Sequence, residues 1–276
     1  MSTTRIKHLA VVLATSSIAF VLIEQAPEAS AHEPHVAARP PTRPMPAIVL
    51  VHGAFTDASG WADVIHILLK KGFNVTAVQN PLTGYAQDVA TTRRLIAAQT
   101  GPVVVVGHAY GGAVITSAAA GNPHVRALVF VAAFAPDSGE AIDAYDDTYP
   151  SALRTALRGD AKGFMYIDRA SFRDVFARDL SASEAGIMAA AQRPADSSDF
   201  DSSPNVAAWR TIPSWYVVAQ DDHAINPQLE RFFAMRMRAH TTEIKSSHVV
   251  YISHPEPVAA IIEEAALVTA MNFAQQ

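Results

Sequence analysis

A histidine and an aspartate in the last quarter of the chain have the types and the order of an acid–base pair. His248 follows a predicted strand region and precedes the closing helical pattern. Imidazole suits a general base because its pKa lies near neutral pH. A carboxylate must fix the tautomer of that ring and stabilise its charged form. Asp221 and Asp222 both follow the apolar run 215–218, so the sequence predicts proton transfer with either aspartate as the acid.

The choice of base rests on placement, because the chain holds 11 histidines. His254 is the alternative to His248. It precedes Pro255 and is typical of a residue that lies at the start of a helix. His248 is therefore the expected base.

The position at which a nucleophile would be expected holds alanine. Ala109 stands within Gly107-His108-Ala109-Tyr110-Gly111-Gly112, between the apolar run 103–106 and a helical pattern. The glycines permit a sharp strand-to-helix turn that projects the central side chain into a site. A glycine cluster also serves dinucleotide binding, but there it follows the first strand of the domain, whereas here it follows the third apolar run. A methyl group at such a turn cannot attack a substrate.

Two backbone N–H groups near this turn are candidates for binding a negatively charged oxygen. Acyl transfer develops such an oxygen, and donors that are held in place beforehand stabilise it. One donor is expected at Tyr110, directly after the turn, and the other in the loop that follows His52-Gly53. Because the backbone supplies both donors, the absence of a hydroxyl at position 109 leaves this oxyanion hole intact.

Short apolar runs alternate with helical patterns along the chain. The runs span 47–51, 75–78, 103–106, 127–132 and 215–218, and the clearest helical patterns span 88–98, 110–119 and 257–273. Continuous runs with β-branched residues fit strands that are buried on both faces. Strands that alternate with helices predict an α/β fold with a mostly parallel central sheet and helices on both faces.

The region 137–209 interrupts this alternation. It holds short helical pieces rich in Ala, Arg and Asp, and no strand-like run. About 70 residues without a strand is long for one crossover connection, so we predict a helical cap inserted into the sheet domain. Aromatic side chains in and around the cap are candidates for lining the pocket of a moderately apolar small molecule. Phe134, Tyr145 and Trp209 are foremost among them.

Composition limits the class of partner and cofactor. Of the 276 residues 50% are hydrophobic and 17% are charged, and the formal net charge is -5. One sizeable core is therefore expected, and electrostatics gives no reason to expect nucleic acid as a partner. The absence of cysteine excludes disulfides, thiolate metal sites and lipidation on cysteine. The sequence has no phosphate-binding loop and no run of metal ligands, so no metal or other cofactor is expected.

The first 45 residues are expected to lie outside the folded domain. A basic N-terminus precedes an uncharged apolar run, 9–23, and a polar stretch then ends in small residues. This order predicts a signal peptide over 1–31, with export to the periplasm or the exterior. The apolar run is short for a membrane span, so no stable anchor is expected after cleavage. Residues 32–45 are rich in proline and predict an extended tether before the domain at 46–276.

Three stretches together resemble bacterial α/β-hydrolases of the esterase and hydroxynitrile-lyase-like group. They are His52-Gly53-Ala54-Phe55, Gly107-His108-Ala109-Tyr110-Gly111-Gly112 and Ser247-His248-Val249-Val250-Tyr251-Ile252-Ser253-His254-Pro255. The similarity runs from Pro46 to the C-terminus. It implies the α/β-hydrolase fold, and it is more specific for the fold than for the substrate.

The resemblance implies a catalytic triad whose nucleophile is missing. Ala109 stands where the family has its nucleophilic serine, and His248 stands where it has its base. The family's acid falls on Asp222 rather than on Asp221. Ser117 is no replacement for the serine, since it lies two turns further along the following helix, where its hydroxyl cannot reach the turn.

The resemblance also implies where the oxyanion donors lie. The loop donor falls on Ala54, with Phe55 next to it, opposite the donor already expected at Tyr110. His52 matches a family histidine whose usual role is structural.

Three interpretations of Ala109 follow. In the first, Ala109 replaces the serine of a carboxylic ester hydrolase and leaves an inactive, substrate-trapping variant. In the second, the chain is a naturally non-catalytic, ligand-binding homologue. In the third, His248 and Asp222 alone carry serine-independent chemistry, as a lyase or a cofactor-free oxygenase. The first is favoured because the glycines, base, acid and oxyanion loop are all present, and a long-inactive site has little reason to keep them. Amide, lactone or carbon–carbon bond cleavage would use the same scaffold, and the sequence leaves the oligomeric state open.

Overall fold

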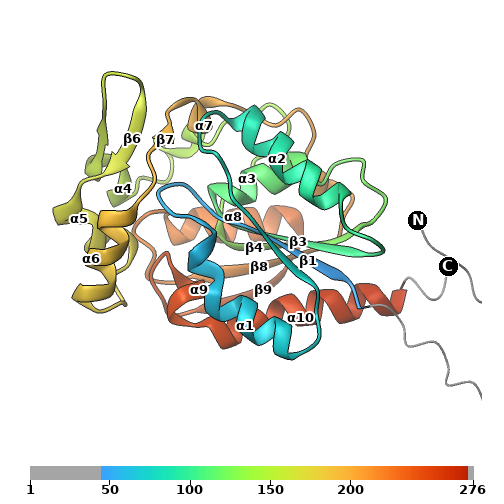
Figure 1. Ribbon diagram of the computed structural model, residues 1–276. Helices are drawn as coiled ribbons and strands as arrows, with labels where there is room; N and C mark the ends of the chain where they lie inside the picture. The colour runs from blue at the N-terminus through green and yellow to red at the C-terminus, as the bar shows by residue number, and fades with distance from the viewer. Residues whose placement is uncertain (1–44, 273–276) are drawn as a thin grey trace, which may run out of the picture. The chain divides into compact units, whose positions relative to one another are not determined.

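The computed structural model describes residues 45–272, with side chains described up to residue 270. Six strands form one central sheet in the order β2-β1-β3-β4-β8-β9 (Figure 1). They are β1 (Ala47–Val51), β2 (Val75–Val78), β3 (Val103–Ala109), β4 (Val125–Ala133), β8 (Ser214–Ala219) and β9 (His240–Ile244). Every neighbouring pair in this sheet is parallel. The predicted α/β fold with a mostly parallel sheet is therefore confirmed.

The central strands are buried along almost their whole length. Every residue of β1, β3 and β8 is buried, as is every residue of β4 except Arg126. Covering of both faces explains the continuous apolar runs in the sequence. β9 lies at the edge, and its residues His240–Glu243 are exposed. It has no apolar run, and for that reason the sequence did not predict it.

Helices cover both faces of the sheet. In the sheet domain they are η1 (Ala58–Trp61), α1 (Ala62–Lys70), α2 (Tyr85–Ala97), α3 (Tyr110–Ala118), α8 (Pro227–Met237), α9 (Val250–Ser253) and α10 (Pro255–Asn272). α1 and α10 pack against each other on one face, and α2 and α3 pack against each other on the opposite face (Figure 1). The two layers enclose one continuous apolar core.

An insertion of mixed secondary structure, residues 134–213, occupies the region predicted as a helical cap. It contains η2 (Asp143–Tyr145), α4 (Ala152–Ala156), β5 (Leu157–Gly159), β6 (Phe164–Ile167), α5 (Arg169–Phe176), α6 (Ala182–Ala191), β7 (Ala195–Asp196), α7 (Ser198–Asp201) and η3 (Ala208–Arg210). β5, β6 and β7 form a small antiparallel sheet, so the expectation of an insertion without strands is wrong. These strands have only two to four residues, too few to carry a clear alternation of apolar and polar residues.

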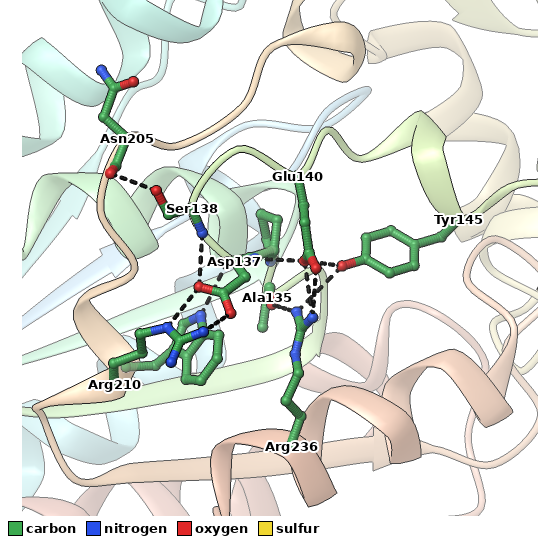
Figure 2. A network of polar contacts seen from close by, with 10 residues as sticks. Ala135, Asp137, Ser138, Glu140, Tyr145, Asn205, Arg210 and Arg236 are labelled. Carbon is green, nitrogen blue, oxygen red and sulfur yellow. Dashed lines mark hydrogen bonds and ion pairs between the residues drawn. The ribbon is translucent and has the colours of Figure 1, made fainter.

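Polar contacts join the two ends of the insertion (Figure 2). Arg210, near its end, donates to both carboxylate oxygens of Asp137, near its start. The Ser138 hydroxyl donates to the carbonyl oxygen of Asn205 at 2.7 Å. These contacts close the insertion into a loop that begins and ends beside the sheet.

The predicted signal peptide over 1–31 and nearly all of the predicted tether over 32–45 lie outside the described residues. Within residues 45–272 no helix combines the length and the apolar character needed to cross a membrane.

Candidate active site

Ala109 occupies a sharp and strained turn between β3 and α3. Its backbone angles are φ 50° and ψ -122°, in a region that residues with a Cβ rarely adopt. The residues around it must be glycines because neighbouring backbone atoms leave no room for a Cβ. A Cβ on Gly107 would lie 2.6 Å from the carbonyl oxygen of Gly111, and one on Gly112 would lie 2.3 Å from that of Phe134. The turn therefore has the geometry of a nucleophile elbow, with a methyl group at its apex.

The loop after β1 lies directly against this methyl group. A Cβ on Gly53 would come within 2.7 Å of the Cβ of Ala109, so only glycine permits this approach. Ala54 and Phe55 follow in the same loop and are buried, and Phe55 has a positive φ of 62°. The structure thus brings the predicted loop of the oxyanion hole next to position 109.

Tyr110, the other predicted oxyanion residue, is the first residue of α3 and is anchored by its side chain. Its hydroxyl donates to Asp88 Oδ2 at 2.9 Å, while Asp88 Oδ1 accepts the N–H of Leu82 at 2.9 Å. Burial, and then the nearby Asp88 carboxyl, raise the pKa of Tyr110, so the phenol is neutral at ordinary pH. This anchor holds the first turn of α3 in place behind the elbow.

His248 and Asp222 form a buried pair. The Nδ1 of His248 lies 2.6 Å from Asp222 Oδ2, and the two residues are 2% and 3% exposed. Asp222 Oδ1 accepts the N–H groups of Ala224 and Ile225 at 2.7 and 2.9 Å. Asp221 is exposed and makes no such contact with the imidazole. Because Nδ1 faces the carboxylate, Nε2 is the ring nitrogen available for proton transfer.

His108 joins this pair to the elbow. It immediately precedes Ala109, and its Nε2 donates to the carbonyl oxygen of His248 at 3.0 Å. The two imidazole rings lie 4.7 Å apart, centre to centre. Burial, and then the charge of His248, lower the pKa of His108, so this ring is neutral. Residues 109, 222 and 248, far apart in the sequence, thus meet in one region of the molecule.

The other histidines considered have different partners. His254, the alternative base, bonds through Nδ1 to the hydroxyl of Ser253 at 2.9 Å. His52 is buried, donates from Nδ1 to the carbonyl oxygen of Gly53 at 2.7 Å, and accepts the N–H of Asn80 at 2.9 Å. Burial lowers the pKa of His52 to about 4, which suits the structural role that the resemblance implied.

A cavity of about 300 Å³ lies between the insertion and the sheet domain. Phe134 lines it as predicted, and the Phe134 N–H donates to the carbonyl oxygen of Ala109 at 3.1 Å. Ile225, which donates to Asp222, lines it from another side. Phe200 lines it from α7, and the Phe200 ring is 6.0 Å from the ring of Tyr110. The cavity is therefore bordered by residues that contact Ala109, Asp222 and Tyr110.

Tyr145 and Trp209 were expected to line this pocket, but the residues that line it do not include them. Tyr145 contacts Arg236 instead (Figure 2), and the Trp209 ring also lies against Arg236. Arg236 donates to the Tyr145 hydroxyl at 3.2 Å and to both carboxylate oxygens of Glu140 at 2.9 Å, and its guanidinium lies 5.2 Å from the Trp209 ring. These aromatic rings hold the insertion on α8, a role that composition alone could not distinguish from pocket lining.

Several residues that contact the acid–base pair were not foreseen. Phe176, from α5, places its ring 4.7 Å from the His248 imidazole. Glu230, from α8, is fully buried near Asp222. Neither residue has a local sequence signal, since a Phe or a Glu in an amphipathic helix is ordinary. Within residues 45–272 no group of three or more His, Asp or Glu side chains is arranged to hold a metal ion.

Comparison with known proteins gives the family. Residues 48–261 match the model of the Alpha/beta hydrolase family, so the chain belongs to that family. A probable hydrolase, R7, from Phoma sp. is 26% identical over 80% of this chain and 98% of its own length. A pyrethroid hydrolase from Sphingobium faniae JZ-2 has a TM-score of 0.69 at 19% identity, covering 82% of this chain and 99% of the other. Polyneuridine aldehyde esterase has a TM-score of 0.70 at 19% identity, covering 80% and 98%.

Proposed function

We propose that this protein is a carboxylic ester hydrolase in which Ala109 replaces the nucleophilic serine, so that it binds an ester without turning it over. The observation that carries this proposal is the strained elbow at Ala109 in the same region as a complete His248–Asp222 pair. Such backbone strain persists only where the surrounding structure enforces it, and it clusters at functional sites. A turn of this kind is useful for presenting one side chain to a substrate.

With serine at position 109, the pair would support acyl transfer in two steps. His248 Nε2 takes the hydroxyl proton while the oxygen attacks the ester carbonyl carbon, and His248 then gives that proton to the departing alcohol. The carbonyl oxygen becomes negative and accepts the N–H groups expected at Ala54 and Tyr110. Water next attacks the acyl carbon while His248 takes its proton, and His248 then returns that proton to the oxygen of residue 109 as the carboxylic acid leaves. Asp222 stabilises the imidazolium in both steps.

The chain as it stands has a methyl group in place of the hydroxyl, which closes this route. Loss of the nucleophile from a triad costs on the order of 10⁶-fold in kcat. The backbone donors and the cavity do not depend on the hydroxyl, so binding is retained. We infer that Ala109 was introduced in place of serine, because every other part of the site is still present. A naturally non-catalytic homologue is the alternative.

The cavity supports a moderately apolar substrate of small size. Its volume of about 300 Å³ lies at the lower end of the range for small-molecule sites. Most of the side chains that line it are aliphatic or aromatic, and fewer of them are acidic than apolar. We propose that this cavity takes the apolar acyl or alcohol part of the ester.

A second candidate function is serine-independent chemistry by the acid–base pair alone, as in a lyase or a cofactor-free oxygenase. The observation that favours it is the short, buried His248–Asp222 contact, which supplies a general base without any hydroxyl at position 109. Turnover by the chain as it stands, abolished by His248→Ala, would favour this candidate.

Restoration of the nucleophile tests the first proposal. Ala109→Ser should hydrolyse short aryl esters, and the double variant Ala109→Ser/His248→Ala should not. The chain with Ala109 serves as the matched control and should bind a non-hydrolysable ester analogue with the same affinity as the restored protein. A restored protein that is folded and binds the analogue but hydrolyses no aryl ester would overturn the esterase proposal.

A further inference from the structure

The connection between α5 and α6, in the insertion, reaches the loop that carries His248. Asp179 Oδ2 accepts the N–H of Ser247 at 3.0 Å and the hydroxyl of Ser246 at 2.7 Å. The hydroxyl of Ser247 donates to Asp179 Oδ1. One carboxylate thus accepts three hydrogen bonds from the two residues that immediately precede His248.

The donors of these hydrogen bonds are buried, although Asp179 itself is exposed. Ser246 is 1% exposed and Ser247 is 3% exposed. Burial raises the pKa of Asp179, but the hydrogen bonds from Ser247 and Ser246 outweigh this effect and leave the pKa below its ordinary value. The carboxylate is therefore charged at neutral pH, and charge-assisted hydrogen bonds are stronger than neutral ones.

The same segment makes two further contacts near the acid–base pair, one with the His248 ring and one with the residue that follows Asp222. The ring of Phe176 lies 4.7 Å from the His248 imidazole. Arg178 donates from Nη1 to His223 Nε2 at 3.2 Å, and His223 Nδ1 donates to the carbonyl oxygen of Asp174 at 3.1 Å. His223 directly follows Asp222. Residues 174–179 therefore touch both the loop of the base and the loop of the acid.

The sheet domain holds His248 from the other side. His108 donates to the carbonyl oxygen of His248, and Asp222 accepts from the ring. The carbonyl oxygen of Ser246 accepts the N–H of Asp221 at 3.0 Å, so the sheet domain also holds part of the backbone before His248. Asp179 is the group that accepts the N–H of Ser247, and it belongs to the insertion.

We propose that Asp179 is a positioning residue, whose carboxylate fixes the backbone at Ser246 and Ser247 so that the His248 imidazole stays aligned with Asp222. The acid–base pair is then fully ordered only while the insertion is seated on the sheet domain. This inference rests on the role of His248 as the base in the proposed function.

The test compares two aspartates of the same segment. Asp179→Ala removes all three hydrogen bonds, and Asp179→Asn retains an oxygen acceptor. Asp174→Ala is the matched control, because Asp174 contributes only its backbone carbonyl to these contacts. The first readout is the imidazole Nδ1–H proton resonance of His248 in the chain with Ala109, measured by NMR. We expect Asp179→Ala to broaden or shift this resonance, Asp179→Asn to shift it less, and Asp174→Ala to leave it unchanged.

The second readout uses the same substitutions in the Ala109→Ser background. Misalignment of a catalytic group by a fraction of an ångström to 1 Å can cost up to about 100-fold, so we expect kcat to fall by about 10–100-fold with KM within about threefold. The pH profile of kcat should shift with Asp179→Ala and not with Asp174→Ala. An unchanged resonance and an unchanged kcat in folded Asp179→Ala would overturn the proposal. If Ala109→Ser has no esterase activity, the proposed function fails while the NMR comparison still decides the role of Asp179.

Discussion

The buried carboxyl group of Glu230 lies beside the buried carboxyl group of Asp222 in the core of the protein. Glu230 is fully buried, its Oε2 accepts the N–H of Ala219 at 2.9 Å, and its Oε1 accepts no hydrogen bond from the described residues. Burial, and then the charge of Asp222, raise the pKa of Glu230 well above its ordinary value. Glu230 is therefore protonated at neutral pH, and Asp222 is the carboxyl group that faces His248.

Glu230→Gln should preserve stability and Glu230→Ala should not. The amide of glutamine keeps a donor and an acceptor, so Glu230→Gln should change the free energy of unfolding by less than about 1 kcal/mol. Alanine leaves a cavity and an unpaired Ala219 N–H, so Glu230→Ala should lower the free energy of unfolding by about 2–4 kcal/mol. Since the folded-state pKa is raised, the native protein holds an extra proton above pH 4.5 and loses stability as pH rises. Denaturant unfolding should show that the free energy of unfolding falls less between pH 5 and pH 8 for Glu230→Gln than for the parent protein. Equal destabilisation by both variants would mean that Glu230 is ionised.

Asp199 predicts a second pH effect. It is fully buried, and burial, followed by the nearby Asp88 carboxyl, raises the pKa of Asp199 from 3.8 to about 7. The native state binds this proton more tightly than the unfolded state does, so stability falls as pH rises from 3.8 to about 7 and changes little above. Asp199→Asn should remove this fall and gain about 1–2 kcal/mol relative to the parent between pH 5 and pH 8, with allowance for solvent screening. Asp201→Asn, at an exposed position of the same helix, should show the same dependence of stability on pH as the parent. If Asp199→Asn showed that dependence too, the prediction would be contradicted.

Two glycines, Gly112 at the elbow and Gly186 in α6, predict opposite effects of substitution by alanine. Gly112→Ala would place a Cβ 2.3 Å from the carbonyl oxygen of Phe134, and that backbone has no room to move. We expect a loss of more than about 3 kcal/mol, or failure to fold. Gly186→Ala, in α6, meets no atom within 4 Å and should stabilise by about 0.5–1 kcal/mol. Thermal unfolding of the two variants measures this contrast, and a tolerated Gly112→Ala would contradict the elbow geometry.

The polar network in Figure 2 predicts unequal roles for two arginines. Arg236→Ala removes the contacts to Glu140 and Tyr145 and the stacking on Trp209, and should cost about 1–3 kcal/mol. Arg210→Ala breaks an ion pair whose arginine is exposed, and the melting temperature should hardly change. A larger effect from Arg210→Ala would reverse this ranking.

The sequence predicted the sheet core better than the insertion, for a physical reason. β1 and β2 match their predicted runs, and the helix predicted over 110–119 is α3 (Tyr110–Ala118). β1 and α3 are buried almost throughout, and burial produces a recognisable pattern. β9 is an exposed edge strand, and β5, β6 and β7 are short, so neither kind leaves a pattern.

The site was predictable where chemistry requires a residue at a fixed place in the fold. Asp222 and His248, expected from the order of the chain and from family resemblance, lie 2.6 Å apart at Oδ2 and Nδ1. Contacts such as those of Asp179 depend on how the insertion folds back across the sheet domain. No local pattern encodes that path, and the same holds for the seating of Tyr145 and Trp209 against Arg236.

The most direct measurement is covalent labelling at residue 109. An aryl organophosphonate should add one phosphonyl group to Ala109→Ser, and mass spectrometry of the digested protein should locate it on the peptide that spans position 109. The chain with Ala109 should take up no label there, and Ala109→Ser/His248→Ala should take it up far more slowly. A folded Ala109→Ser protein that remains unlabelled, or labelling that does not depend on His248, would contradict the convergence of residues 109, 222 and 248 on one reactive point.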